Sequence, residues 1–480
     1  MSKFKSSRWM AAALLATIAV PTIGAAQDAA PVVDDKAAAK AAKAAAKAAE
    51  KERRAQEAAE RKRLAALRRQ YGEGPYPDEI DAYLADKPEA LKPLYRTLFT
   101  GGERNAVLNF QRLGLAAMDR GLWSDAERSF DAALTRIEAV YAKNKQAEAA
   151  RDTFRKEANK DFKGEPYERA MAYYYRGLLY LRAGDYDNAR ASFRTAEYQD
   201  TISEAEEFKS DFAVMNYLVG WTYHCQNQPS MAEEAFGFAT EAQPGLTAPG
   251  SDDRLLMVAE YGHSPMKARA GAQSEKMIFE ASPQSAETAA RFELGDTAAF
   301  DAVPASSVYY QATTRGGRAI DAILNGKAEF KATTGAVGDA LTTSSLVSMA
   351  SGNLDSGTLG LAGAGMLLSL FASAAKTEAD IRMWDTLPDM ITVATAKAAD
   401  PGKLKAARVD YLTGTETVAT KAPIMAAANG SCAILWSRSR AEDAVSADVP
   451  GEDSALAAKI ARRKDIQQRD KAFRVSLLGH

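Results

Sequence analysis

The feature that most constrains this chain is the stretch at 164–196, GEPYERAMAYYYRGLLYLRAGDYDNARASFRTA. Its apolar side chains recur at helical spacing on both sides of Gly184, and glycine adopts the positive φ of a sharp turn at little cost. Small Gly177 lets a neighbouring backbone approach closely, and Phe193 has the size to fill the space beside it. The stretch therefore predicts two short antiparallel helices that pack tightly against each other.

The same order of small and aromatic residues occurs once before and once after this stretch. The matching positions are Phe110, Gly114, Ala126, Phe130 and Ala133 on one side and Gly220, Tyr223, Ala232, Phe236 and Ala239 on the other. The pattern resembles the tetratricopeptide repeat, a helix pair that buries its apolar face by stacking on its neighbours. The units lie farther apart than the usual period of about 34 residues, so we expect insertions between them. We predict an all-α, tetratricopeptide-like repeat module over residues 73–249.

Residues 1–26 have the pattern of an export signal. Basic residues precede an apolar run at 10–20, and small residues lead up to Ala26. We expect a signal peptide that is cleaved after Ala26 and a periplasmic protein, with association with the outer membrane left open. The alternative is a retained anchor, although the apolar run is short for a membrane span.

Residues 27–72 are dominated by alanine and charged side chains. Between 36 and 69 there are twelve basic and four acidic residues, whereas the whole chain has a net charge of −2. This composition favours a helix with little to bury. We predict a long exposed helix that acts as a spacer, or as an arm that contacts anionic envelope polymers or lipids; the alternative is a solvated linker without a partner. The balanced total charge points to no nucleic-acid partner.

After residue 250 the hydrophobic pattern changes from helical spacing to alternation, which is typical of strands. We predict a separate α+β domain over 250–440 with a mainly antiparallel sheet, and a polar tail with a short helix over 441–480. The expected strands are 254–261, 276–281, 307–314, 390–396, 406–412 and 431–437.

Two features of the chain leave alternatives open. Residues 356–375 carry no charge and could cross a bilayer by length, but their serines and glycines favour a buried helix. Cys225 and Cys432 belong to different predicted domains. We expect two buried thiols, with a disulfide as the alternative, because the sequence does not place the two within bonding distance.

Little in the chain points to catalysis. It has three histidines and two cysteines, and it lacks the nucleophile, phosphate-binding and zinc motifs. His263 and Ser264 are adjacent, which does not by itself make a nucleophile–base pair, and they fit a turn that leaves a strand. We therefore expect neither an enzyme nor a cofactor or metal site.

The helical module instead predicts a binding groove. In tetratricopeptide proteins the first helix of each unit lines the concave face, and the residues carried over to that face here are mostly apolar or aromatic. They are Leu115, Met118, Tyr174, Leu178, Arg182, Tyr217 and Trp221. Aromatic and methionine side chains are common anchors of protein interfaces. We predict that the groove binds a protein partner in the cell envelope; the alternative is that another segment of the chain fills it.

A closer resemblance rests on three short sequences, PYER at 166–169, GKAEF at 326–330 and RMWDTLP at 382–388. They are similar to a largely uncharacterised family of exported bacterial tetratricopeptide proteins, many of them lipoproteins, that are often encoded beside lipoproteins similar to the curli secretion channel. This chain lacks the family's lipid-attachment cysteine near the signal. The resemblance implies a scaffold role in cell-envelope or outer-membrane assembly. The competing hypothesis is an envelope hydrolase or glycan-binding protein with its site in 250–440.

Overall fold

The computed structural model describes residues 35–141, 161–201, 212–270, 276–295, 299–313, 379–397, 404–441 and 443–478. Two compact units divide the chain after Gln70. The predicted signal segment, residues 326–330 and the uncharged stretch at 356–375 lie outside the described residues. Within the part of the chain that the structure describes, no helix is both long and apolar enough to cross a membrane.

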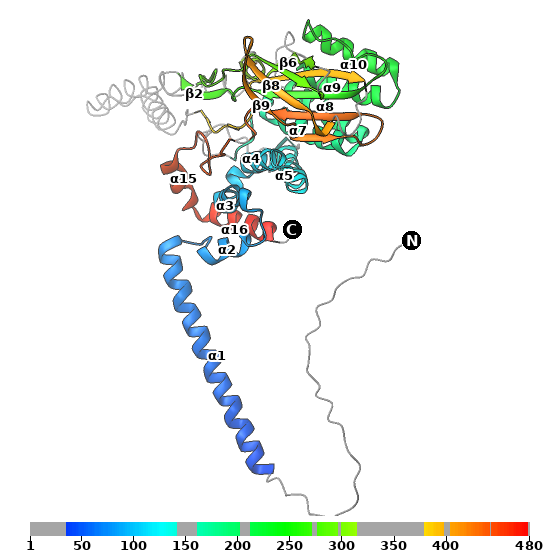
Figure 1. Cartoon of the computed structure of the whole chain (residues 1–480). Helices are drawn as coiled ribbons and strands as arrows, with labels where there is room; N and C mark the ends of the chain where they lie inside the picture. Colours follow the sequence, from blue (N-terminus) through cyan, green and yellow to red (C-terminus); the bar gives the residue numbers. More distant parts are fainter. Residues whose placement is uncertain are drawn as a thin grey trace, which may run out of the picture. The chain divides into compact units, whose positions relative to one another are not determined.

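In the first unit the structure describes the helix α1 (Asp35–Tyr71), coloured blue in Figure 1. Its side chains are exposed along most of its length. Ion pairs one turn apart support it between residues 50 and 63, and in one of them Arg54 Nη2 lies 2.5 Å from Glu50 Oε1. Pairs at this spacing stabilise a helix without any core to pack on.

The second unit contains three helix pairs, each joined by a short turn. They are α4 (Ala106–Met118) with α5 (Trp123–Tyr141), α7 (Pro166–Ala183) with α8 (Tyr186–Thr201), and α9 (Ala213–Cys225) with α10 (Pro229–Ala242). Gly184 adopts φ +75° between α7 and α8, and the next residue, Asp185, accepts a hydrogen bond from Asn188 N at 3.2 Å. The turn therefore lies where the sequence predicts it.

Each pair is closed by a glycine on the first helix and a phenylalanine on the second. A Cβ added to Gly114 would lie 3.0 Å from the ring of Phe130, and one added to Gly220 would lie 2.8 Å from Phe236. The corresponding contact in the middle pair, Gly177 with Phe193, is closer still. The small residues are needed because the aromatic rings occupy the space where a side chain would be.

The strands form three sheets. The five-stranded sheet has the order β10 (Met425–Ala427), β11 (Ala433–Arg438), β1 (Asp253–Tyr261), β7 (Met390–Lys397), β6 (Val303–Ser307). The four-stranded sheet has the order β5 (Ala299–Asp301), β4 (Ala289–Glu293), β8 (Arg408–Thr413), β9 (Glu416–Lys421), and β2 (Met266–Ala270) pairs with β3 (Lys276–Glu280). Only β1 and β11 pair in parallel among these described strands.

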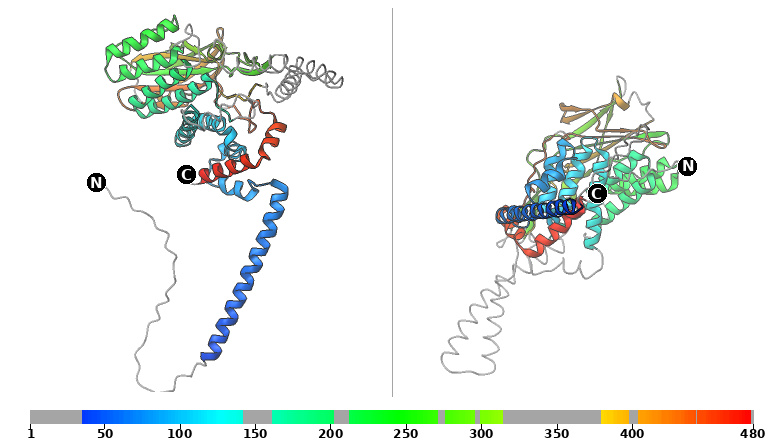
Figure 2. Two further views of the ribbon diagram at one scale, coloured as in Figure 1. Left: turned by 180° about the vertical axis from the view of Figure 1, so that it is seen from behind. Right: turned by 90° about the horizontal axis from the view of Figure 1, so that it is seen from below.

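The central strand β1 is buried on both faces, which orders the unit into three layers. Leu256 and Val258 belong to one core cluster with the helix pairs. Leu255 and Met257, which alternate with them, pack in a second cluster with the four-stranded sheet. In the right-hand view of Figure 2 the helices of this unit lie beneath the strands. The five-stranded sheet is thus the middle layer, between helices and a second sheet.

The predicted division into a 73–249 module and a separate 250–440 domain is not what the structure shows. All described residues from Tyr71 onward form one compact unit. One core cluster contains residues of α4, α7 and α9 together with residues of β1, β7 and β11. The change of hydrophobic period near residue 250 therefore marks the passage from the helical layer to the sheet and not a domain boundary. A sheet with two apolar faces must be covered on both, and the helices cover one of them.

One further segment differs from the predicted strands. Residues 308–313, predicted as part of a strand, form the short helix α11 (Val308–Thr313). Ser307 Oγ accepts a hydrogen bond from Tyr310 N at 3.1 Å, which is the action of a helix-capping serine and outweighs the strand propensity of valine and tyrosine.

The C-terminal tail ends in α15 (Ser454–Ala461) and α16 (Lys464–Leu478). Phe473 of α16 is buried and lies edge-on to Phe110 of α4, with ring centroids 6.2 Å apart. Near this end of the unit lie α2 (Pro77–Leu84) and α3 (Lys92–Gly101) (Figure 1). The tail therefore covers the start of the helical stack.

Candidate functional site

The predicted groove residues lie inside the molecule. Six of the seven are at most 2 % exposed: Leu115, Met118, Tyr174, Leu178, Tyr217 and Trp221. They share a single core cluster with Trp436 of β11 and residues of β1 and β7. The seventh, Arg182, is half-buried, with its guanidinium 4.4 Å from the centre of the Trp123 ring. The chain's own sheet fills the groove, which corrects the prediction that these side chains contact an external partner.

A buried carboxylate lies at the centre of this filled groove. Glu260 of β1 accepts hydrogen bonds from Tyr174 Oη at 2.9 Å, Tyr175 Oη at 2.8 Å and Trp436 Nε1 at 2.8 Å. Its Oε2 also lies 3.1 Å from Arg438 Nε. Burial raises the pKa of Glu260, and the cation and the three donors oppose that rise. All four neighbours favour the ionised form, so the group joins helix to sheet and offers no free acceptor for a reaction.

The same arginine continues the network to the helical side. Arg438 Nη1 donates to both carboxylate oxygens of Asp119, at 2.8 Å and 2.6 Å, directly after α4. Burial raises the pKa of Asp119, and the guanidinium opposes that rise. One arginine on β11 thus pairs with two buried carboxylates, one from the sheet and one from the helical side.

A second buried ion pair joins two of the short sequences that carry the family resemblance. Glu168, in PYER, accepts from Lys267 Nζ of β2 at 2.6 Å through Oε2, and from Trp384 N, in RMWDTLP, at 2.8 Å through Oε1. Glu168 Oε2 also accepts from Glu165 N at 2.7 Å and so caps α7. The glutamate and the lysine are at most 1 % exposed. These motifs hold the crossing segment at 379–389 against the helices.

That crossing segment carries further charge pairs. Arg382 donates to Asp380 Oδ2 at 2.6 Å and to Asn105 Oδ1 at 2.7 Å. Arg112 of α4 is fully buried and donates through Nε to Asp385 Oδ1 at 2.9 Å. The sequence-based reasoning missed these residues, although charged side chains inside otherwise apolar runs were a visible signal for buried pairs.

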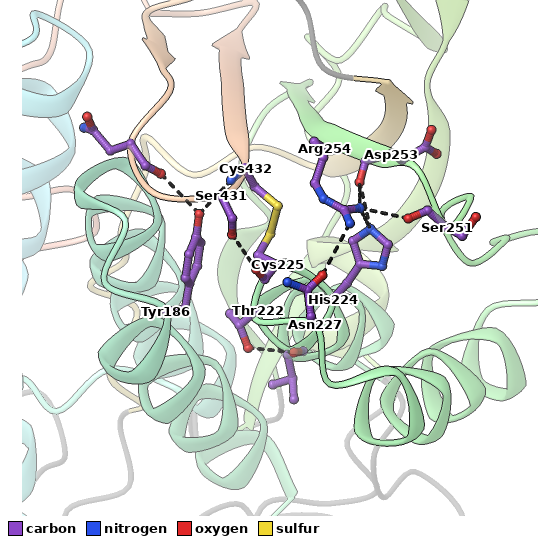
Figure 3. Close-up of a disulfide and its surroundings, with 12 residues drawn as sticks. Tyr186, Thr222, His224, Cys225, Asn227, Ser251, Asp253, Arg254, Ser431 and Cys432 are labelled. Atoms are coloured by element: carbon purple, nitrogen blue, oxygen red, sulfur yellow. Dashed lines mark hydrogen bonds between the residues drawn. A yellow bond between two sulfur atoms is a disulfide. The ribbon is translucent and has the colours of Figure 1, made fainter.

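The two cysteines form a disulfide at one corner of the helix–sheet contact (Figure 3). Cys225 at the end of α9 and Cys432 before β11 have Cα atoms 5.7 Å apart, and the expectation of two buried thiols is therefore wrong. The sequence predicts different domains for the two residues and so does not indicate that they lie close together. Tyr186 of α8 binds the same loop, since its hydroxyl accepts from Cys432 N at 2.9 Å and donates to Asn429 O at 3.1 Å.

Beside the disulfide, one ring nitrogen of His224 faces two polar groups of the first strand (Figure 3). Its Nε2 is 2.7 Å from Asp253 O and 2.9 Å from Arg254 Nη1. The ring stacks on Trp221 with centroids 5.4 Å apart. His263, the other histidine considered above, follows β1, and its backbone N–H donates to Ser285 Oγ at 2.8 Å. Ser264 Oγ donates instead to Trp384 O at 3.0 Å, so the adjacent pair does not form a nucleophile and base.

Open clefts at the surface of the described residues include the following two. One of about 450 Å³ lies above the Asp119–Arg438 pair and is also lined by Arg120, Thr420 and Lys421. The other, of about 360 Å³, lies where β6 and α11 meet the end of α10 and has no charged residue in its lining. Over the described ranges, no cluster of three or more histidine, cysteine or carboxylate side chains is arranged to hold a metal ion.

An exposed stripe runs along the outer side of α10, the last helix of the stack. Met231 and Phe238, 40 % and 50 % exposed, are seven residues apart and so lie on one side of the helix. Glu234 follows Met231 by three residues, and Glu241 follows Phe238 by three. Both glutamates therefore lie on the same side of the helix, and both are exposed. We call these four residues the α10 stripe. Tyr198 of α8, 61 % exposed, is another large apolar side chain open to solvent on the second helices of the pairs.

Comparison with models of known protein families, with functionally characterised proteins and with experimentally solved structures gives no match to this chain. Its candidate function therefore rests on its own residues. Those residues give a helical stack with an occupied inner face and an apolar, acidic stripe on its last helix.

Proposed function

We propose that this protein is an exported scaffold of the bacterial cell envelope that binds a partner protein through the α10 stripe. In this proposal the three helix pairs are tetratricopeptide-type repeats, α1 is a long spacer helix, and the export signal directs the chain to the periplasm. The chain acts by binding and not by catalysis. The partner presents apolar pockets with lysine or arginine beside them.

The observation that carries the proposal is the stripe itself. Repeat stacks need a polar face on their last helix to stay soluble alone. Here Met231 and Phe238 occupy that face, in alternation with Glu234 and Glu241. Exposed methionine and aromatic side chains are typical interface anchors, and interspersed carboxylates select partners with complementary charge.

The inner face does not compete for this role. Its aromatic residues are buried, and the hydroxyls of Tyr174 and Tyr175 are bound to Glu260. An external ligand would have to displace the sheet and leave that carboxylate without its donors, which is costly. A partner therefore has to use the outer surface of the stack.

The test is site-specific photo-crosslinking in cells. A photoreactive residue at Glu234 should give one discrete adduct in the envelope fraction, and one at Thr417, exposed on β9, should not. In the charge-reversed variant Glu241→Lys, with the probe still at position 234, the adduct should be lost. Diffuse adducts, or an adduct that persists with the reversed charge, would contradict the proposal.

A further inference from the structure

The helix α1 carries a stripe of lysines that is independent of the scaffold function proposed above. Lys36, Lys40, Lys43, Lys47 and Lys51 are all exposed, and we call them the lysine stripe. At about 100° per residue these five positions fall within a sector of roughly 80°, and at 1.5 Å per residue they extend over about 22 Å. The stripe is therefore a narrow row of cations along one side of a straight helix.

The positive charge of most of these lysines is not paired with carboxylates of the same helix. From residue 50 onward, Glu50, Glu57 and Glu60 of α1 pair with arginines. In the described part of the chain, Lys40, Lys43, Lys47 and Lys51 take part in no ion pair. These four lysines thus lie together in the first half of the helix.

The opposite side of the helix limits what can bind. Between 37 and 49 every residue that is not a lysine is alanine, so the first half has no large apolar side chain to insert into a membrane or a protein groove. Leu64 and Leu67 occur only near the other end. Binding through the stripe must then be electrostatic and reversible by salt.

We propose that the lysine stripe adsorbs α1 to a lipid surface that carries anionic headgroups. A flat surface meets all five lysines at once, within the screening length of about 8 Å at physiological ionic strength. A flexible soluble polyanion could reach the same charges, but it would lose conformational entropy when it is straightened along the helix. The planar array of lipid headgroups is already ordered and fits the row better.

The test is co-sedimentation of the full chain with vesicles. Wild-type protein should bind vesicles of phosphatidylglycerol mixed with phosphatidylcholine, should not bind phosphatidylcholine alone, and should be released at about 1 M salt, where the screening length is about 3 Å. Replacing Lys40, Lys43, Lys47 and Lys51 with glutamine, which also favours a helix, should abolish binding.

Two rearranged variants distinguish the effect of the lysine stripe from the effect of net charge. In K40A/A42K/K47A/A49K two lysines move to the opposite side of the helix, and we expect about a tenfold loss of vesicle binding because they lie a helix diameter farther away. In K40A/A58K/K47A/A65K two lysines move along the same side, and binding should stay within about twofold of wild type. Both variants keep the composition and net charge of α1.

Three results would overturn the proposal. Equal binding of both rearranged variants would mean that charge alone, without the stripe, governs binding. Binding of the wild-type protein to phosphatidylcholine alone would show that anionic headgroups are not required. Binding of long-chain inorganic polyphosphate with the same dependence on the stripe, together with no binding to anionic vesicles, would make a soluble polyanion the ligand.

Discussion

The inner and outer sides of the helical stack both carry large apolar and aromatic side chains, but in opposite environments. On the inner side, Tyr174 and Trp221 are buried against the sheet of the same chain; on the outer side, Phe238 and Met231 remain open to solvent. The difference lies in what meets them. The hydroxyl of the inner Tyr174 has a buried acceptor, Glu260, 86 residues later in the chain, whereas the outer Phe238 has no polar atom to pair and is 50 % exposed.

This comparison shows how an aromatic groove that is already filled can be distinguished from one that awaits a ligand. Tyrosine and tryptophan need a partner for their polar atoms when they are buried. Glu260 of β1 supplies one acceptor group for two tyrosines and a tryptophan. A glutamate inside an otherwise apolar strand is thus a sign that donors approach from another layer of the same protein.

The largest expected effect comes from removing that acceptor. Glu260→Gln leaves Arg438 with one carboxylate fewer and places an amide against three donors, so we expect a loss of about 3–5 kcal/mol in the free energy of unfolding. Urea denaturation at neutral pH measures it. Glu416→Gln on the exposed strand β9 is the control and should change stability by less than about 0.5 kcal/mol. Similar values for the two variants would mean that the Glu260 cluster does not hold the layers together.

The disulfide should give the next largest effect. It joins α9 to the start of β11 over a sequence separation of 207 residues, and removing a bridge that closes so long a loop costs about 2–5 kcal/mol. Denaturation of C225S/C432S under oxidising conditions, compared with wild type, tests this. Adding a reductant should destabilise the wild type and leave the variant unchanged; equal stability of the two proteins without reductant would contradict the expectation.

A pH-dependent contribution is expected from Asp380. Burial alone would raise the pKa of its carboxyl, but Arg382 outweighs burial and holds the pKa below the ordinary 3.8. A carboxyl with a lowered pKa stabilises the fold above its unfolded pKa, and the contribution is lost as the pH falls below about 3.8. Asp380→Asn should cost about 1.5–3 kcal/mol at pH 7.

Denaturation of the wild type and Asp380→Asn from pH 7 downward measures this contribution. The difference between the two should shrink as the pH falls through 3.8. A difference in unfolding free energy that stays constant with pH would show that the variant loses stability through packing and not through the charge of Asp380. Arg382 stays unchanged in both proteins, so the comparison isolates the carboxyl.

Local structure could be predicted from the sequence where it depends on near neighbours. The Gly177–Phe193 contact and the turn at Gly184 follow from residues within one helix pair. The strands β1 and β7 lie close to the predicted 254–261 and 390–396, because their apolar runs are long and flanked by turns. Short strands such as β5 and β10 were missed because three residues carry too little periodicity.

The candidate site could not be predicted in the same way, because it depends on how layers meet. Tyr174 and Glu260 are far apart in sequence, and so are Glu168 and Lys267. Hydrophobic periodicity identifies the apolar face of each element but not its partner. When a groove and a sheet are predicted as separate domains, the apolar face of each has no partner. The sequence therefore predicts a ligand site on the inner face and two free thiols.

The smallest effect on stability is expected on the outer side, in M231S/F238S. Both side chains are exposed, and exposed substitutions away from caps and buried pairs usually change stability by less than about 0.5 kcal/mol. Denaturation should therefore give nearly the wild-type midpoint, whereas crosslinking from position 234 should be lost. A large destabilisation would mean that these residues pack within the molecule as the inner aromatics do. The two sides would then not differ, because methionine and phenylalanine on the outer face would be explained by their contribution to stability. No binding partner would be required to account for them.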